Sequence, residues 1–281
     1  MSEVRVYTSE TGLGNPIRLF GDIFKGFREG RFLGYQLFIR DLKASVRQSF
    51  LGFLWHFIPA IATAVIWIML NSQNVVTIEN VPMKFPAFAI TGTILWTLIT
   101  ESMNKPLMRF VAAKGMMVKL NFPKEALVLA IFYDLMFSFL LKMLVLLPAL
   151  LVMGYYPTIE WIMAILMIVP MYIFGVAVGL LLVPLGMLFM DISKGMTYIF
   201  QIVMYLAPVV YPVQKIGAMG VIHKWNPVTP YIEFIRSNFG GYQFDMYFQL
   251  VLWSVFGIVF LFVGLVLIRI SLPVILERSG S

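Results

Sequence analysis

The 281-residue sequence has no cysteine and only two histidines, His56 and His223. Without cysteine the chain cannot form disulfide bonds, a thiolate nucleophile or a cysteine-based metal site. Two histidines are too few for a metal centre unless several carboxylates join them. Charged residues are also scarce, at 12% of the chain, whereas a soluble domain carries about 25%. This shortage of charged residues is typical of a polytopic membrane protein rather than of a soluble globular protein.

A phosphate-binding loop is missing as well, because no stretch of the chain reads G-x-x-x-x-G-K-[ST]. The sequence also lacks a soluble catalytic domain, an internal repeat and a low-complexity linker. If this protein uses ATP to move a cargo against a gradient, a separate chain must bind and hydrolyse the nucleotide. We therefore expect no cofactor in this chain.

Apolar sequence is abundant: 60% of the residues are hydrophobic, and the mean hydropathy is +0.88. A hydrocarbon core about 30 Å thick requires ~20 apolar residues per helix. We therefore predict an all-α, polytopic membrane protein with six transmembrane helices. The predicted spans are residues 51–72, 86–110, 125–153, 160–186, 195–213 and 246–270.

Basic residues indicate the orientation of these spans. The net charge is +7, but the basic side chains flank apolar runs and form no long patch, so we expect no nucleic-acid partner. They gather before the first span and in 105–124, whereas the loops 73–85 and 154–159 hold only Lys84. The positive-inside rule then places both termini in the cytoplasm. The charged N-terminal region also argues against a cleavable signal peptide.

The loop 214–245 is an exception, because it must lie outside and yet contains Lys215, Lys224 and Arg236. Prolines interrupt the moderately apolar sequence around it. We predict short, broken helices that form a re-entrant segment between the fifth and sixth spans. Such backbone is tolerated only where it is buried in protein or lines a cavity. The prolines are Pro208, Pro212, Pro227 and Pro230.

Residues 1–49 are predicted to be a cytoplasmic segment that precedes the transmembrane domain, 50–281. Asn15 and Pro16 are favourable residues for a helix start, and we expect Gly30 to end this helix. A second amphipathic stretch follows, and both helices are predicted to lie in the membrane interface. The polar side of the second helix carries Arg40, Lys43 and Arg47.

Two pairs of ionisable residues lie within or near the apolar runs. Asp134 and Lys142 are the deepest, and each costs ~2.5–3.5 kcal/mol to insert at the centre of a span. They either line a hydrophilic conduit or, in the case of Lys142, reach back to an interface. Glu101 and Lys105 form either an ordinary i,i+4 pair or part of a channel mouth.

Small residues recur in the fourth span, where Gly175 and Gly179 have the spacing that lets two helices approach closely. Such a contact could lie within one chain or between two copies. The sequence leaves both arrangements open.

Aromatic residues make up 15% of the chain. Most tryptophans and tyrosines suit the membrane interface, but a group near the middle of the spans could line a conduit for sugars. Rings pack on the C–H faces of a sugar chain, and tyrosine hydroxyls bond to its hydroxyl groups. Taken alone, each ring is more often helix-packing material. The candidates are Trp96, Tyr133, Phe137, Tyr172 and Tyr205.

The junction RDLKASVRQSFLGFLWHFIPA, which starts at Arg40, resembles the motif that precedes the first span in ABC-2 type permeases that export polysaccharides. That motif reads D-L-K-x-x-x-x-x-S-x-L-G-x-L-W. Further stretches agree in order and spacing, so the resemblance covers about residues 35–270. One departure is Met190, before Asp191, where the family commonly has arginine. The agreeing stretches are KLNFPKE from Lys119, LAPVVYP from Leu206 and NPVTPY from Asn226.

The resemblance implies a homodimer that forms a continuous channel and binds two copies of an ATPase subunit, which holds ATP and Mg. The implied cargo is a lipid-linked glycan, O antigen in particular. The implied location is the inner membrane of a bacterium, where the chain contacts membrane lipids. The loop after the second span would dock on the ATPase beside the surface helix 31–48, and the re-entrant segment would form an outer gate. The implied coupling residues are Met117, Lys119, Asn121, Phe122, Pro123 and Glu125, the interface-helix residues are Arg40, Lys43 and Arg47, and the outer-gate residues are Pro208, Tyr211, Pro212, Asn226 and Pro227.

Two other functions stay open. A permease for a small lipophilic drug would share the architecture but have a narrow, apolar, closed dimer interface. An intramembrane acyl- or glycosyltransferase would need clustered carboxylates or a histidine near the membrane surface. Only Asp134, Glu101 and His56 are available, and they lie on different predicted spans.

Overall fold

The computed structural model describes residues 16–47, 52–75, 78 and 81–280. These residues form helices and the loops between them, without a strand, so the all-α prediction is confirmed for this part of the chain. The predicted capping residue Asn15 lies outside it. The elements are α1 (Pro16–Arg47), η2 (Gly52–His56), α2 (Ile58–Ser72), α3 (Phe85–Lys119), α4 (Glu125–Val152), α5 (Ile159–Leu188), α6 (Met190–Val203), η3 (Met204–Leu206), α7 (Gly217–Trp225), α8 (Thr229–Gly240) and α9 (Tyr247–Gly280).

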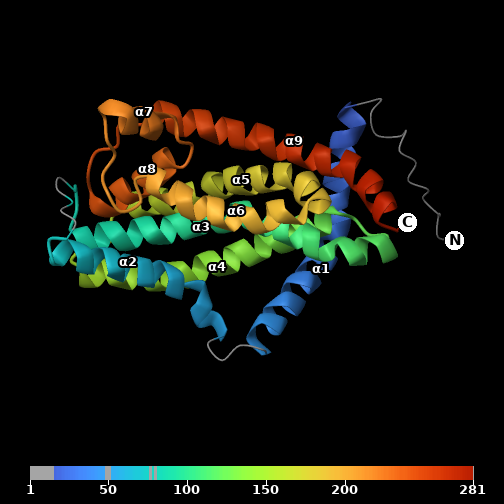
Figure 1. Ribbon diagram of the computed structural model, residues 1–281, viewed down its shortest axis with the longest axis horizontal. Helices are drawn as coiled ribbons and strands as arrows, with labels where there is room; N and C mark the ends of the chain where they lie inside the picture. The colour runs from blue at the N-terminus through green and yellow to red at the C-terminus, as the bar shows by residue number, and fades with distance from the viewer. Residues whose placement is uncertain (1–15, 48–51, 76–77, 79–80, 281) are drawn as a thin grey trace.

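The helices α3, α4, α5, α6 and α9 run along the long axis of the molecule (Figure 1). α1 crosses the end of this bundle at which α3 finishes, α4 begins and the C terminus lies. The short helices α7 and α8 lie at the opposite end. We refer to these ends as the α1 end and the α7 end.

Among the described residues, three helices are long and apolar enough to cross a membrane: α4, α5 and the Tyr247–Glu277 part of α9. By length and composition, the described residues thus support three of the six predicted spans. α2 has 15 residues and α6 has 14, fewer than the ~20 that a span requires. α3 is long enough with 35 residues, but Glu101, Lys105 and Arg109 interrupt its apolar sequence.

The fifth predicted span, 195–213, is shorter than expected because α6 ends at Val203 and gives way to the 3-10 helix η3. Irregular backbone follows as far as α7. The predicted loop 214–245 contains two short helices, α7 with nine residues and α8 with 12. Short, broken helices are thus present where the prolines predicted them.

α1 is one continuous helix of 32 residues, so the predicted break at Gly30 is wrong. Gly26, Gly30 and Gly34 recur every four residues and face the beginning of α4. A Cβ atom at Gly34 would lie 2.8 Å from the carbonyl oxygen of Ala126 and 2.8 Å from the Cβ of Leu129. These glycines therefore let α1 lie close against α4, and their role is packing rather than helix termination.

The glycines of α5 make a second close contact, this time with α3. A Cβ atom at Gly179 would lie 2.8 Å from the Cγ of Pro106, and one at Gly175 would collide with Ser102. The question that the sequence left open is answered, because this contact lies within one chain.

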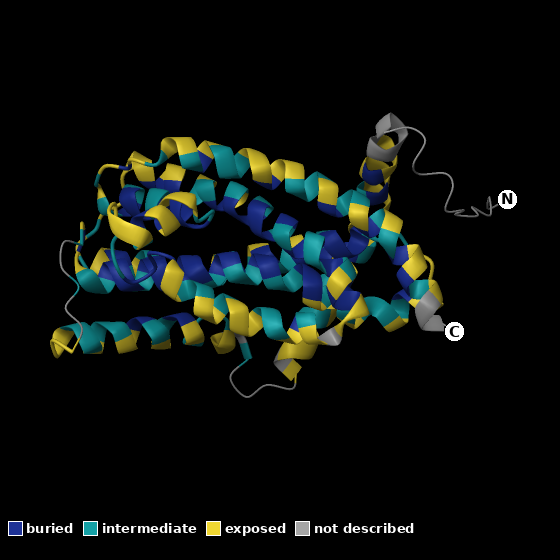
Figure 2. Cartoon of the chain, turned by 45° about the horizontal axis from the view of Figure 1, so that its top comes forward, coloured by how far each residue is buried: buried dark blue, intermediate teal, exposed yellow. Residues whose placement is uncertain are grey.

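Burial is highest where α3 and α5 pass through the bundle. Buried residues gather on the inside of the bundle, and exposed residues cover the outer faces of the peripheral helices (Figure 2). Only 17% of the apolar window of α9 is buried, and its exposed side chains include Val251, Val255 and Ile258. An exposed apolar surface of this kind suits lipid tails.

Replacing Gly34 with alanine is expected to destabilise the protein, because the added methyl group would collide with α4. Overpacking costs about 1–3 kcal/mol, and better helix propensity offsets up to ~1 kcal/mol of this loss. The measurement is the melting temperature of the purified chain in detergent.

Gly21→Ala is the matched control on the same helix, since nothing lies within 4 Å of the added Cβ atom. Its melting temperature should stay unchanged or rise slightly. Equal melting temperatures for the two variants would contradict the close contact between α1 and α4.

Candidate functional site

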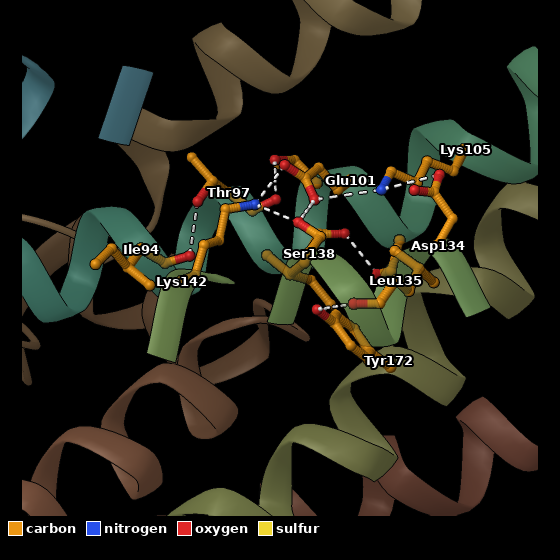
Figure 3. Close-up of polar contacts among 12 residues, drawn as sticks. Ile94, Thr97, Glu101, Lys105, Asp134, Leu135, Ser138, Lys142 and Tyr172 are labelled. Carbon is orange, nitrogen blue, oxygen red and sulfur yellow. Dashed lines mark hydrogen bonds and ion pairs between the residues drawn. The ribbon is translucent and has the colours of Figure 1, made fainter. Parts of the chain in front are cut away.

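A network of charged side chains joins α3 to α4 inside the bundle (Figure 3). The ammonium group of Lys142, which is 0% exposed, donates to Oε1 of Glu101 and, over 2.9 Å, to Oγ of Ser138. Ser138 Oγ donates in turn to Oε2 of Glu101 over 2.6 Å. A carboxylate and a hydroxyl therefore compensate the buried charge in place of water.

Lys105 extends this network toward the α1 end. Its Nζ lies 3.1 Å from Oδ2 of Asp134 and 3.7 Å from Oε2 of Glu101. Glu101 and Lys105 thus form the i,i+4 pair that their spacing allowed, and each also pairs with a residue of α4. Asp134 and Lys142 are linked through α3 rather than directly, and the charges of the network balance.

The carboxylates that the sequence placed on different helices are thereby brought into one network. Glu101 and Asp134 are both engaged by lysine, and the ring of His56 packs on Phe137 with centroids 6.0 Å apart. Within the described residues, no group of three or more histidine, aspartate and glutamate side chains suits a metal ion. The chemistry of this arrangement is charge compensation between helices.

The aromatic residues predicted to line a channel do not form one surface in this chain. Trp96 and Tyr172 are buried, and the hydroxyl of Tyr172 donates to the carbonyl of Leu135 over 3.3 Å. Tyr205 is 62% exposed and lies in η3, directly after α6. The first two rings pack the interior, whereas Tyr205 is available to a neighbour.

Tyr133 and Phe137 lie where α4 meets α1. Both rings have centroids 6.1 Å from that of Phe38, and Tyr133 also contacts Tyr35 edge-on. These contacts tie α4 to α1. A role for either ring in a channel wall stays a prediction.

The loop between α3 and α4 borders a pocket of about 670 Å³ at the α1 end. α1 contributes Gly26 to its lining and α9 contributes Arg269. Glu125 lies between these two helices, because its carboxylate abuts Gly26 and its Oε1 lies 3.7 Å from Nη2 of Arg269. All the predicted coupling residues line this one pocket: Met117, Lys119, Asn121, Phe122, Pro123 and Glu125.

The loop presents both apolar and basic side chains. Leu120 is 57% exposed, and Val118, at the end of α3 beside the loop, is 45% exposed. The ammonium of Lys124 lies 4.7 Å from the centroid of the Phe122 ring. Burial lowers the pKa of Lys124, while the nearby Glu125 carboxylate acts in the opposite direction. An exposed apolar surface rimmed by polar side chains is typical of an interaction site.

The basic residues predicted on the interface helix lie in the second half of α1. Arg40 donates from Nε to Oδ1 of Asp41 over 2.8 Å, and Nη2 of Arg109 donates to Oδ2 of the same carboxylate over 2.6 Å. α1 is thereby tied to α3. Lys43 and Arg47 are exposed, and their predicted contact with lipid or a partner stays a prediction.

At the α7 end, the predicted outer-gate residues are brought together. We call residues 206–212 the proline segment. The hydroxyl of Tyr211, in this segment, donates to the carbonyl of Tyr205 in η3 over 2.7 Å. The Tyr211 ring stacks on His223 of α7 with centroids 5.6 Å apart, and Nδ1 of His223 accepts the backbone N–H of Gln214 over 2.9 Å. The segment is therefore folded against α7.

Asn226 and Pro227 connect α7 to α8. Nδ2 of Asn226 donates to the carbonyl of Leu206 over 3.3 Å, and its Oδ1 accepts the backbone N–H of Val228 over 2.9 Å. The carbonyls of Pro208 and Pro212 also accept hydrogen bonds, the first from Arg236 and the second from Gln214.

Arg236 had no functional role in the sequence analysis. Its signal was its position, a basic residue in a loop that the charge pattern placed outside.

Comparison with known proteins gives a consistent family assignment. The family model described as ABC-2 type transporter matches residues 34–240. An O-antigen export system permease protein RfbA from Myxococcus xanthus is 24% identical over 226 residues, which cover 79% of this chain and 84% of that protein. A protein of the same name from Klebsiella pneumoniae is 25% identical over 228 residues, with 80% and 86% covered.

Replacing Lys142 with methionine is expected to lower stability, because Glu101 then loses its partner inside the bundle. Removing one member of a buried ion pair costs about 3–5 kcal/mol, and Lys105 should offset part of this loss. Adding Glu101→Gln should restore part of the stability. The measurement is thermal unfolding of the single and double variants.

Lys25→Met serves as the control, since Lys25 pairs over 3.8 Å with Glu29 on the surface of α1, where both side chains are 48% exposed. Such pairs contribute about 0–1 kcal/mol. If Lys142→Met were no more destabilising than Lys25→Met, the network would not support the fold.

Proposed function

The chain belongs to the ABC-2 type transporter family, and from this premise we propose that it is the channel-forming membrane subunit of an ATP-driven polysaccharide exporter. Its cargo is a lipid-linked glycan, O antigen in particular. The observation that carries the proposal is the family match over residues 34–240. This range takes in both the α3–α4 loop and the proline segment. Relatives named as O-antigen export permeases support the cargo.

In the proposed arrangement the α1 end faces the cytoplasm of a bacterium and the chain crosses the inner membrane six times. α4, α5 and α9 cross as apolar helices, and α2, α3 and α6 complete the set. α2 and α6 are extended by the irregular segments beside them, and packing within the bundle compensates the charges of α3. Lys114, Lys119 and Lys124 at the α1 end support this orientation through the positive-inside rule.

α1 lies across the bundle (Figure 1), and this direction suits a helix in the membrane interface. We therefore propose that residues 1–49 form a cytoplasmic segment and residues 50–281 the transmembrane domain, with both termini in the cytoplasm. The proline segment, α7 and α8 then form a re-entrant outer gate.

Export follows from the coupling of this chain to an ATPase. Two copies of the chain form the channel, and two ATPase subunits bind ATP and Mg and dock at the pocket beside the α3–α4 loop. Glu125 lies against both α1 and α9 there. Movement of the loop would therefore reach both helices. Arg40, Lys43 and Arg47 lie on α1 near this docking surface or contact lipid headgroups.

The wall of the conduit would be completed by the second copy. Tyr198, Ile202 and Tyr205 are 68%, 66% and 62% exposed, at α6 and just after it. Rings on such a surface can stack on sugars without a deep binding well. Of the five channel-lining candidates, Tyr205 is the most exposed to a neighbouring copy or cargo.

Expression of this chain in a strain that lacks its own O-antigen permease tests the cargo. Together with the ATPase that copurifies with it, the chain is expected to restore glycan at the cell surface, measured by gel electrophoresis of extracted lipopolysaccharide. The purified chain alone should hydrolyse no ATP, because the nucleotide site lies in the partner. If the strain gained no surface glycan but changed its sensitivity to lipophilic compounds, this result would favour a drug permease and contradict the proposal.

Leu120→Asp is expected to weaken docking of the ATPase, because it places a charge in an exposed apolar part of the loop. Loss of one well-packed anchor weakens a complex by about tenfold or more, equal to ~1.4 kcal/mol. The measurement is the affinity of the purified chain for its ATPase. Ile216→Asp is the control, since Ile216 is 89% exposed at the α7 end. Equal loss of affinity in the two variants would place docking elsewhere.

A further inference from the structure

Arg236 of α8 is fully buried at the α7 end. Its Nη1 donates to the carbonyl oxygen of Pro208 over 3.0 Å, and its Nη2 donates to that of Val209 over 2.6 Å. Both carbonyls belong to the proline segment. One side chain thus binds two consecutive peptide groups of a segment that has no regular secondary structure after Leu206.

The proline segment needs such a partner. Its backbone leaves the helical hydrogen-bonding pattern after η3, and Pro208 has no N–H of its own. Buried carbonyls without a partner are unfavourable, above all away from water. A guanidinium is suited to the task because its donors form a rigid planar fork, whereas lysine presents a single flexible ammonium.

Two further contacts hold the guanidinium of Arg236, although its buried Nε has no hydrogen-bond partner in the described structure. The ring of Phe88 on α3 lies 3.6 Å from the guanidinium carbon, which gives a cation–π contact. Nη1 lies 3.6 Å from Oε2 of Glu233, and Oε1 of Glu233 accepts the hydroxyl of Tyr242 over 3.1 Å. The guanidinium is therefore held by α3 and α8 while it binds the proline segment.

α3 leaves room for this arrangement at Gly92. A Cβ atom at this position would overlap both the carbonyl oxygen of Val209 and Nη2 of Arg236. Gly92 thus allows the proline segment and the guanidinium to meet directly on the surface of α3. The contact depends on two residues that are far apart in the sequence.

We propose that Arg236 is a positioning residue of the outer gate: it clamps the proline segment onto α3 and α8. The clamp keeps residues 206–212 in one place, so that Tyr211 and Asn226 hold α7 and the start of α8 around it. The assignment of these elements to a gate rests on the proposed export function. The clamp itself rests on the contacts of Arg236.

The chain has no cysteine, so a single introduced cysteine reports local opening cleanly. Val210→Cys places the probe in the proline segment, where Val210 is 3% exposed. The purified variant in lipid nanodiscs is treated with a water-soluble maleimide, and the rate of labelling is measured. Arg236→Lys and Arg236→Met are each expected to raise this rate at least about tenfold, equal to ~1.4 kcal/mol in the opening equilibrium.

Gly92→Ala tests the same contact with Arg236 intact, and it should also raise the labelling rate. Its matched control is Gly115→Ala on the same helix, where nothing lies within 4 Å of the added Cβ atom. This variant should label at the rate of the parent protein. Gly92→Ala keeps the proposal testable even if the Arg236 variants do not fold.

A second probe separates local opening from general unfolding. Ala164→Cys lies in α5 and is 0% exposed, so it should stay unreactive in every variant. Reactivity at both probes would overturn the proposal, because Arg236 would then support the whole fold rather than the segment. Parent-like labelling of Val210→Cys in the Arg236→Lys and Gly92→Ala variants would overturn it as well.

The clamp and the export function are separate hypotheses, and the clamp's role in a gate rests on the export function. Measuring surface glycan in parallel with labelling distinguishes between them. Faster labelling together with reduced glycan export supports a clamp within the gate. Faster labelling in a protein whose parent exports no glycan would refute the export function and leave the clamp standing. Reduced export with parent-like labelling would refute the clamp and leave the export function standing.

Discussion

The bundle depends on one constraint, which is that a polar group inside a membrane must be satisfied by the protein itself. Lys142 meets it through Glu101, and the two Nη groups of Arg236 meet it through the carbonyls of the proline segment. Each of these contacts joins elements that are distant in the sequence. Charges that would be unfavourable alone therefore become the contacts that fix the order of the helices. An apolar contact is compatible with many rotations of a helix about its own axis, whereas a contact between paired charges is compatible with few.

The same constraint explains why the hydropathy of a helix does not predict how deeply that helix is buried in the bundle. α3 is the most polar of the long helices in the bundle, yet it has the longest set of buried residues. Neighbouring helices surround it, so its charges meet protein groups rather than lipid. α9 is the opposite case, since its window has a hydropathy of 2.8 and only 17% of it is buried. α5 has nearly the same hydropathy, 2.6, but 44% of its window is buried. Hydropathy alone therefore does not report how deeply a helix lies in this bundle.

The sequence predicted the helices better than the contacts between them. The spans 125–153 and 160–186 match α4 and α5 to within two residues at each end, because each is a long apolar run bounded by polar residues. Gly30 was misread because a glycine that ends a helix and one that packs against a neighbour look alike without the partner. The coupling residues lie together because they are nearly contiguous in the chain. The outer-gate residues fall in two short stretches on either side of α7, which the hydrogen bond from Asn226 to Leu206 joins.

The contacts of the charged residues were harder to foresee, because they depend on helix rotation. Periodicity cannot fix the rotation of a helix that is apolar on every side. Asp134 and Lys142 were recognised as the charges deepest in an apolar run, but their partners lie on α3. Arg236 was visible as a basic residue in an unexpected loop, but the backbone carbonyls that bind it have no sequence signature.

α3 links the two ends of the molecule on which the proposed export cycle acts. Its 35 residues correspond to a length of about 50 Å at ~1.5 Å per residue. Near the α1 end Arg109 is bound to Asp41, and near the α7 end Gly92 carries the proline segment. α5 is pressed against α3 between these points through its glycines. A force at the α3–α4 loop should therefore move α3 and α5 together, since bending either helix would break close contacts. In the proposed dimer, this movement would change the width of the channel at the exposed face of α6.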